Sequence, residues 1–144
     1  MKSVMSGLDL RAIASELSYM VDSHCKKCYQ PHYEQVVLRL RAKDGGNTDL
    51  VLVRGKRVYT SKRDRPMPQY PAPFAMVLRK VLTNARLKAI EQIGFDRVLR
   101  FVFENSHGKF HLYVEVFRDG NIILADGNDI IIQPLTHATY ADRT

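Results

Sequence analysis

The sequence predicts an α+β domain in which helices flank an antiparallel β-sheet. Two segments, 9–20 and 74–85, carry apolar residues at the spacing of an amphipathic helix. Much of the remaining chain divides into short stretches of alternating apolar and polar residues, separated by turn-forming clusters. The 144 residues, 45% of them hydrophobic and 26% charged, suit one globular domain with its own core. We therefore expect residues 1–144 to form one structural unit.

The first expected helix begins at Asp9 and should end near residues 19–21. The apolar residues of its inner face recur at the helical spacing: Leu10, Ile13, Ala14 and Leu17. A carboxylate before the first turn can accept hydrogen bonds from helix N–H groups, and such a cap typically contributes about 1 kcal/mol. Capping is therefore a sufficient structural reason for Asp9.

Four strands are expected before the second helix, at 25–30, 34–41, 49–54 and 57–61. The turn clusters between them are short, which predicts an antiparallel meander. Within the second strand, one set of alternating residues should face inward: Val36, Leu38 and Leu40. The other set should form a largely polar outer face: Val37, Arg39 and Arg41.

Cys25 and Cys28 have the CxxC spacing of some metal and redox sites. No second Cys or His pair completes a zinc set, and strand alternation would place residues i and i+3 on opposite faces. We therefore expect reduced thiols with no metal ion.

The segment 54–65 is strongly basic and leads into a proline-rich stretch at 66–73. Against one acid, Asp64, it holds six basic residues: Arg54, Lys56, Arg57, Lys62, Arg63 and Arg65. One interpretation is a solubilising loop. The other is a phosphate-binding arm, with Tyr59 and Tyr70 available to stack on bases.

The second expected helix, at 74–85, follows Pro73, which suits a first helical position. Its apolar stripe is continuous: Phe74, Val77, Leu78, Val81 and Leu82. On a helical wheel Arg79, Thr83 and Arg86 lie on the opposite flank, with Lys80 further round. This cationic surface is either a solvated face or a contact for a polyanion.

Five further strands are expected at 87–93, 98–103, 109–117, 122–124 and 130–132. The connection Gly94-Phe95-Asp96-Arg97 places an acid and a base side by side on a short turn. An exposed ion pair contributes only about 0–1 kcal/mol, so structural and functional reasons for Asp96 and Arg97 remain equally open.

The composition favours a polyanionic partner and argues against several other classes of protein. The net charge is +7, which attracts nucleic acid, and no apolar run approaches the ~20 residues of a membrane span. No secretory signal pattern begins the chain, so we expect a cytoplasmic protein. The five histidines are scattered and no glycine-rich phosphate loop occurs, so we expect no enzyme and no cofactor.

Four motifs in order resemble the N-terminal domain of the NFACT family, which includes nuclear export mediator factor, Tae2-type proteins and bacterial proteins once called fibronectin-binding protein A. The first comprises Met1-Lys2-Ser3 and Leu8-Asp9-Leu10-Arg11-Ala12. The second comprises Phe74-Ala75-Met76, Arg79-Lys80 and Leu82. The third and fourth are Gln92-Ile93-Gly94-Phe95-Asp96-Arg97 and Gly120-Asn121-Ile122-Ile123-Leu124-Ala125-Asp126. The resemblance covers nearly the whole chain.

The resemblance implies a bent antiparallel β-sandwich flanked by helices, similar to the N-terminal domain of formamidopyrimidine-DNA glycosylases. Those enzymes use an N-terminal proline as nucleophile, whereas this chain begins Met1-Lys2. We therefore expect a non-catalytic domain. Family members continue into further domains, so residues 1–144 would be the first part of an NFACT N-terminal domain, excised from a longer protein.

The implied function is ribosome-associated quality control on large ribosomal subunits obstructed by peptidyl-tRNA. Such factors support C-terminal tailing of stalled chains and, in eukaryotes, recruitment of a Listerin-type ubiquitin ligase. The expected partners are tRNA and the large subunit, with no membrane. In the family, residues at the positions of Asp9, Asp96 and Arg97 are linked to tRNA. To these we add the basic candidates for nucleic-acid binding: Arg57, Lys62, Arg63, Arg79, Lys80 and Arg86. The alternatives are a glycosylase- or lyase-like domain and a purely structural protein-interaction module.

Overall fold

The computed structural model describes residues 12, 14–15, 17–32, 34–42, 46–61, 72–93, 98–116 and 120–135. A 3₁₀ turn, η1 (Leu17–Met20), is followed by the first four strands, β1 (His24–His32), β2 (Gln35–Arg41), β3 (Asn47–Val53) and β4 (Arg57–Ser61). Helix α2 (Pro73–Leu82) comes next. The remaining strands are β5 (Arg86–Gln92), β6 (Val98–Asn105), β7 (Gly108–Glu115), β8 (Ile122–Asp126) and β9 (Ile131–Pro134). Each of the nine expected strands therefore has a counterpart, with ends shifted by a few residues.

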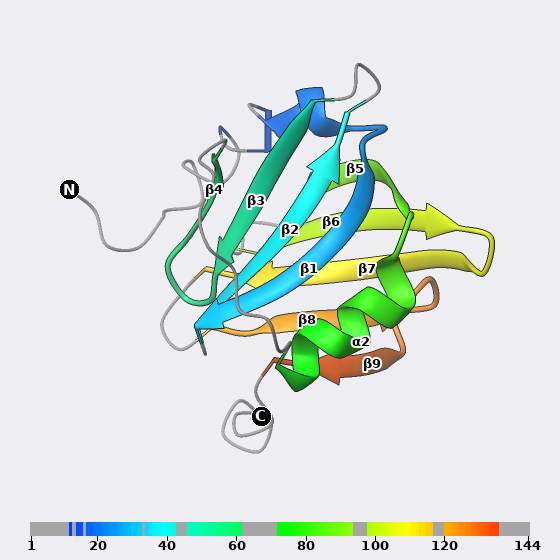
Figure 1. The fold of residues 1–144 in the computed structure, drawn as a ribbon. Helices are drawn as coiled ribbons and strands as arrows, with labels where there is room; N and C mark the ends of the chain where they lie inside the picture. Colours follow the sequence, from blue (N-terminus) through cyan, green and yellow to red (C-terminus); the bar gives the residue numbers. More distant parts are fainter. Residues whose placement is uncertain are drawn as a thin grey trace.

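The strands form one antiparallel sheet in the order β4-β3-β2-β1-β5-β6-β7-β8-β9. Consecutive strands pair with each other except β4 and β5. Strand β5 pairs instead with β1, although β2, β3, β4 and α2 lie between them along the chain. These two strands share one paired position, His24 with Arg86, and their backbone hydrogen bonds extend only to Asp22 with Leu87 on one side and Cys25 with Asn84 on the other. Strands β1–β4 therefore cross over β6–β8 as a second layer (Figure 1). The predicted α+β class is confirmed.

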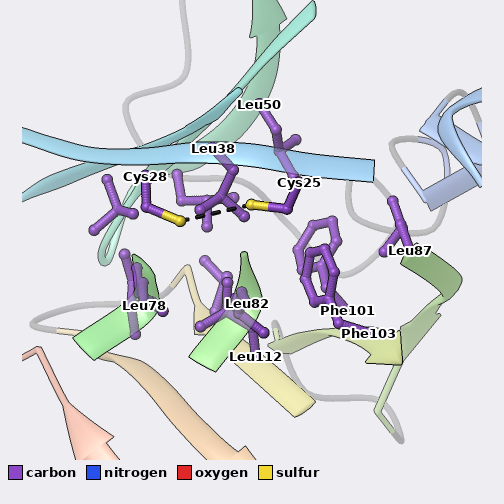
Figure 2. Packing of buried hydrophobic residues seen from close by; sticks show 14 of the residues in the cluster. Cys25, Cys28, Leu38, Leu50, Leu78, Leu82, Leu87, Phe101, Phe103 and Leu112 are labelled. Atoms are coloured by element: carbon purple, nitrogen blue, oxygen red, sulfur yellow. Dashed lines mark hydrogen bonds between the residues drawn. The ribbon is translucent and has the colours of Figure 1, made fainter. Parts of the chain in front are cut away.

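The main core lies between the two layers and under α2. It combines side chains from both halves of the sheet, such as Leu38 and Leu50 with Phe101 and Leu112. Figure 2 shows Leu78 and Leu82 of α2 among them. The predicted helix stripe is confirmed, since Phe74, Leu78 and Leu82 are buried and Val77 and Val81 pack against the core. Burying each such side chain contributes roughly 1.5–3 kcal/mol.

Helix α2 ends at Leu82, three residues before the predicted end at position 85. Thr83 leaves helical geometry (φ −57°, ψ 126°), and Asn84 takes a left-handed conformation (φ 60°), which asparagine tolerates better than most residues. The Asn105 side chain donates to the carbonyl of Val81 (2.9 Å), which satisfies one acceptor of the last turn. The chain leaves the helix here, and the carbonyl of Ala85 accepts a hydrogen bond from the Cys25 N–H of β1 (2.8 Å) in place of another helical turn.

The first helix is confirmed in part. Residues 12, 14 and 15 are helical and η1 ends at Met20, close to the predicted end. Asp9 and the rest of the predicted start lie outside the described residues.

The predicted polar outer face of β2 is wrong at Val37, which is fully buried. Val37 pairs with Tyr29 and Val51 on the neighbouring strands, and the three form a second, smaller cluster. Sheet β1–β4 therefore buries apolar side chains on both faces.

Cys25 and Cys28 were expected on opposite faces, and this is also wrong. Both are buried in the main core with their sulfurs 3.6 Å apart, as Figure 2 shows. In β1, Cys25 pairs with Leu40 and Lys27 with the adjacent Arg39, so Lys26 is the extra residue of a β-bulge. The bulge turns two successive residues outward and restores the inward direction at Cys28. Burial and the hydrogen bond with Cys25 raise the pKa of the Cys28 thiol, the hydrogen bond being the larger cause.

Candidate nucleic-acid interface

The structure describes four of the nine candidate residues. The other five lie outside the described residues: Asp9, Lys62, Arg63, Asp96 and Arg97. Their roles stay predictions.

Arg79 is half-buried, so its expected place on a fully exposed cationic face is wrong. Its Nε–H donates to the carbonyl of Cys28 (2.7 Å), and its guanidinium lies 5.2 Å from the centre of the Tyr29 ring. Arg39 approaches the same ring at 5.4 Å. Tyr29 therefore contacts two guanidinium groups, an arrangement favoured by cation–π attraction.

Arg39 is held by Asp49, the residue opposite it on β3. Its Nε and Nη2 donate to the two carboxylate oxygens at 2.9 and 3.2 Å, a bidentate pair in which Asp49 is almost fully buried. Neither Tyr29 nor Asp49 belongs to a motif that is visible in the sequence. The contact between Arg39 and Asp49 follows from the strand register, because the two residues are opposite each other once β2 and β3 pair.

Lys80 and Arg86 are exposed near the end of α2. Lys80 lies in the last helical turn, where a cation also complements the helix dipole. Arg86 belongs to β5, not to the helix, and its Nη1 lies 3.9 Å from Asp22 Oδ1. Both side chains are available to solvent at this corner of the molecule.

Arg57 lies at the opposite end of the first half-sheet. Strand β3 runs from Asn47, beside Arg41, to Val53, beside Arg57. Arg57 is exposed and its guanidinium lies 5.3 Å from the centre of the Tyr59 ring. Tyr59 also packs against the smaller apolar cluster, so its ring contributes to the packing of the fold and is only partly exposed. Tyr70, the other expected stacking residue, lies outside the described residues.

A second polar cluster lies on β5–β7 and the β8–β9 turn. Arg100 donates to Glu91 (3.0 Å) and to the Tyr113 hydroxyl (3.4 Å). That hydroxyl donates to Asp129 Oδ1 (2.5 Å), and His111 Nδ1 lies 2.7 Å from the same oxygen. His111, one of the five histidines scattered through the sequence, thus connects β7 to this turn.

The charges in this second cluster shift one another's protonation. Hydrogen bonds from Tyr113 and then His111 lower the pKa of Asp129 below its ordinary value. Burial, and then the hydrogen bond with Asp129, raise the pKa of Tyr113. Hydrogen bonds with Tyr113 and Glu91 raise the pKa of Arg100 further, so it stays charged. The hydrogen bonds of Asp129 with His111 and Tyr113 hold the β8–β9 turn against β7.

Among the described residues, no group of three or more His, Cys, Asp or Glu side chains is placed to hold a metal ion. Within the same residues, no helix is both long enough and apolar enough to cross a membrane.

Comparison with known proteins identifies the family. Residues 6–144 match the family model described as NFACT N-terminal and middle domains. The chain is 37% identical over 148 residues to the archaeal Rqc2 homolog aRqcH of Methanocaldococcus jannaschii, covering 99% of this chain and 22% of that protein. It is 34% identical over 140 residues to the human ribosome quality control complex subunit NEMF, covering 96% of this chain and 13% of that protein.

The fold also matches a solved structure, the N-terminal part of the fibronectin/fibrinogen-binding protein from Streptococcus suis. The TM-score is 0.86 at 28% identity, over 97% of this chain and 56% of that one. This chain thus spans about half of the solved relative and less than a quarter of the curated relatives described above. With its family match over residues 6–144 and its two close curated relatives, the chain belongs to the NFACT family, within its N-terminal region.

Proposed function

We propose that this domain binds tRNA as a non-catalytic part of a ribosome-associated quality-control factor. The observation that carries the proposal is the family match over residues 6–144, together with relatives named as ribosome quality control subunits. The net charge of +7 supports it, because RNA is a polyanion. The large subunit obstructed by peptidyl-tRNA is the proposed place of action, in the cytoplasm.

Within this proposal the candidate residues have different roles. Asp9, Asp96 and Arg97 are proposed to contact tRNA, on the strength of the family resemblance. The described cations Arg57, Lys80 and Arg86, with Lys62 and Arg63, would attract its phosphates. Arg79 is kept as a candidate, but its bond to Cys28 and its stacking on Tyr29 give it a structural role as well. C-terminal tailing and support of a Listerin-type ubiquitin ligase would belong to the complete protein.

Direct tRNA binding is tested by fluorescence anisotropy at several salt concentrations. Binding that neutralises Z phosphates gives a log–log salt slope of about −0.7Z to −0.9Z. We expect weak binding, micromolar or weaker, with a steep slope. Absence of binding at low salt up to the solubility limit would refute direct tRNA binding by these 144 residues.

The non-catalytic part of the proposal is tested against a damaged-base DNA duplex. A likeness in fold to the N-terminal domain of formamidopyrimidine-DNA glycosylases would not by itself carry lyase chemistry, because activity depends on the residues of a site and not on the fold. Borohydride should trap no covalent adduct. A trapped adduct would overturn this part, and failure to bind either nucleic acid would favour a protein-interaction module.

The proposed roles of Asp96 and Arg97 are tested by substituting both with alanine. Loss of phosphate or base contacts typically costs about 1–3 kcal/mol of recognition, whereas exposed turn substitutions usually change stability by no more than about 0.5 kcal/mol. We expect tRNA recruitment to stalled large subunits to fall in the complete protein, with the melting temperature of the 144-residue chain nearly unchanged. A large drop in melting temperature with recruitment intact would show that the pair is only a structural turn.

A further inference from the structure

The two halves of the sheet join along a short ribbon made by residues 22–26 and 84–88 (Figure 1). The Cys25 N–H donates to the carbonyl of Ala85 (2.8 Å), and the Asn84 N–H donates to that of Cys25 (2.8 Å). At the other end of the ribbon, the Asp22 N–H donates to Leu87 (2.7 Å). These bonds give the ribbon the antiparallel alternation of side chains.

The alternation separates an apolar inner side from a basic outer side. The inner residues are buried: Ser23, Cys25, Ala85 and Leu87. The outer positions between them carry His24, Lys26, Arg86 and Lys88, and all except the half-buried His24 are exposed. Strand β2 adds the exposed Arg41, which pairs with His24. We call these five residues, His24, Lys26, Arg41, Arg86 and Lys88, the seam face.

Two β-bulges contribute lysines to the seam face. Lys26 is the extra residue of the bulge in β1. In β5, Leu87 pairs with Phe103 and Ala89 with Val102, so Lys88 is the extra residue there. Bulges redirect side chains and are common beside functional sites. In β1 the bulge also lets two lysines in succession, Lys26 and Lys27, face outward while Cys25 and Cys28 stay inside.

The acids around the seam face do not neutralise it. Asp22 lies 3.9 Å from Arg86, an exposed and therefore weak ion pair, and Glu104 stands opposite Arg86 on β6. The Lys26 Nζ donates to the neutral amide oxygen of Asn84 (3.0 Å), which orients the ammonium and leaves its charge intact. The seam face thus has four permanent positive charges and two neighbouring acids.

We propose that the seam face binds the phosphate backbone of RNA. This inference rests on the proposed function and adds Lys26, Lys88, Arg41 and His24 to the candidates known from sequence. Apart from the half-buried His24, the five side chains are lysines and arginines, with no apolar residue to enter a membrane. Their chemistry therefore suits phosphates, which are contacted without regard to base sequence.

The test compares variants that lose exposed lysine charge inside and outside the seam face. Lys26→Gln with Lys88→Gln removes charge from the seam face. Lys109→Gln is the control, since Lys109 is exposed on β7, where it pairs with Glu104. Binding of each 144-residue chain to tRNA is measured by anisotropy over a salt series, and folding by thermal melting.

The seam-face variant should bind about tenfold more weakly at low salt, with a log–log slope shallower by about 1.4–1.8, while the control changes less than twofold. Both should melt like the parent chain. If the parent binds tRNA and the two variants bind equally well, the seam face is refuted and the proposed function stands. If the parent chain itself does not bind tRNA, both the proposed tRNA binding and the seam-face proposal are refuted for these 144 residues.

Discussion

At the scale of single residues, Gly120 lets distant parts of the sheet meet. The Gly55 N–H in the β3–β4 turn donates to the carbonyl of Glu115 at the end of β7 (2.8 Å), and Arg54 Nη1 donates to the carbonyl of Gly120 (3.1 Å). A Cβ at position 120 would lie 2.1 Å from the Glu115 oxygen and 2.9 Å from the Gly55 nitrogen. Position 120 therefore has no room for a side chain, and only glycine fits there.

Gly120→Ala should destabilise the chain by about 2–4 kcal/mol, because backbone atoms cannot move aside without breaking this junction. Urea unfolding measures the change. Gly127→Ala is the milder control, since its Cβ would meet Lys109 at 3.3 Å. Equal stability of the Gly120→Ala variant and the parent would contradict the close approach.

Asp129 predicts a pH dependence at the β8–β9 turn. Its pKa is lowered in the folded state, so its contribution to stability is present above the unfolded pKa of about 3.9 and is lost as pH falls through the folded value. Asp129→Asn keeps a residue that tolerates the left-handed φ of 64° and removes the charge.

The difference in stability between the Asp129→Asn variant and the parent should be below about 1 kcal/mol at pH 7, because the carboxylate is largely exposed, and should shrink below pH 4. Melting temperatures at pH 7 and pH 3 measure it. A stability difference between variant and parent that grows on acidification would refute this role of the Asp129 carboxylate.

At the scale of elements, Arg79 fastens α2 to β1. It donates to a buried strand carbonyl and contacts Tyr29, whose other guanidinium neighbour, Arg39, is fixed by Asp49. The helix is thereby bonded to the backbone of β1 at Cys28, beyond the stretch of β1 that pairs with β5. This tie is independent of the apolar stripe on the other side of α2.

Arg79→Ala should cost about 1–3 kcal/mol, because the carbonyl of Cys28 loses a charged donor and Tyr29 loses a cation. Lys80→Ala, one position along and exposed, should change stability by no more than about 0.5 kcal/mol. Chemical unfolding of both variants measures the contrast. Similar small losses would show that Arg79 is an ordinary surface cation.

At the scale of the whole molecule, one core joins both halves of the sheet. Phe101 on β6 belongs to the same buried cluster as Cys25 and Cys28 on β1. Neither half can expose its side of this cluster without uncovering the other. The chain should therefore unfold in one cooperative step.

Phe101→Ala should lower stability by about 3–5 kcal/mol, the usual cost of a large cavity. The thiols of Cys25 and Cys28 should become reactive at the same urea concentration at which circular dichroism is lost, in the parent and in the variant. Val102→Ala, on the outer side of β6, is the control and should cost far less. Thiol reactivity well before the loss of dichroism would show that the halves unfold separately.

Local patterns of the sequence were sufficient for the elements. The alternation of Val36, Leu38 and Leu40 and the helical spacing of Phe74, Leu78 and Leu82 correctly identified inward faces. Hydrophobic periodicity records which side of an element faces the core, and it is readable within a few residues. Net charge is likewise a sum over the sequence, so a polyanionic partner could be proposed from the sequence alone. The family motifs identified the family for the same reason, since they lie in the residues themselves.

Contacts between distant segments were decided by the tertiary structure. Whether Val37 is buried depends on Tyr29 and Val51, which reach it only when three strands pair. The bulge at Lys26 follows from the pairing with β2, and it reversed the expected direction of Cys28. Arg79 is half-buried because its guanidinium donates to the carbonyl of Cys28, a strand residue 51 positions earlier in the chain. The seam face exists for the same physical reason, because residues 22–26 and 84–88 become one surface only after β1 has paired with β5.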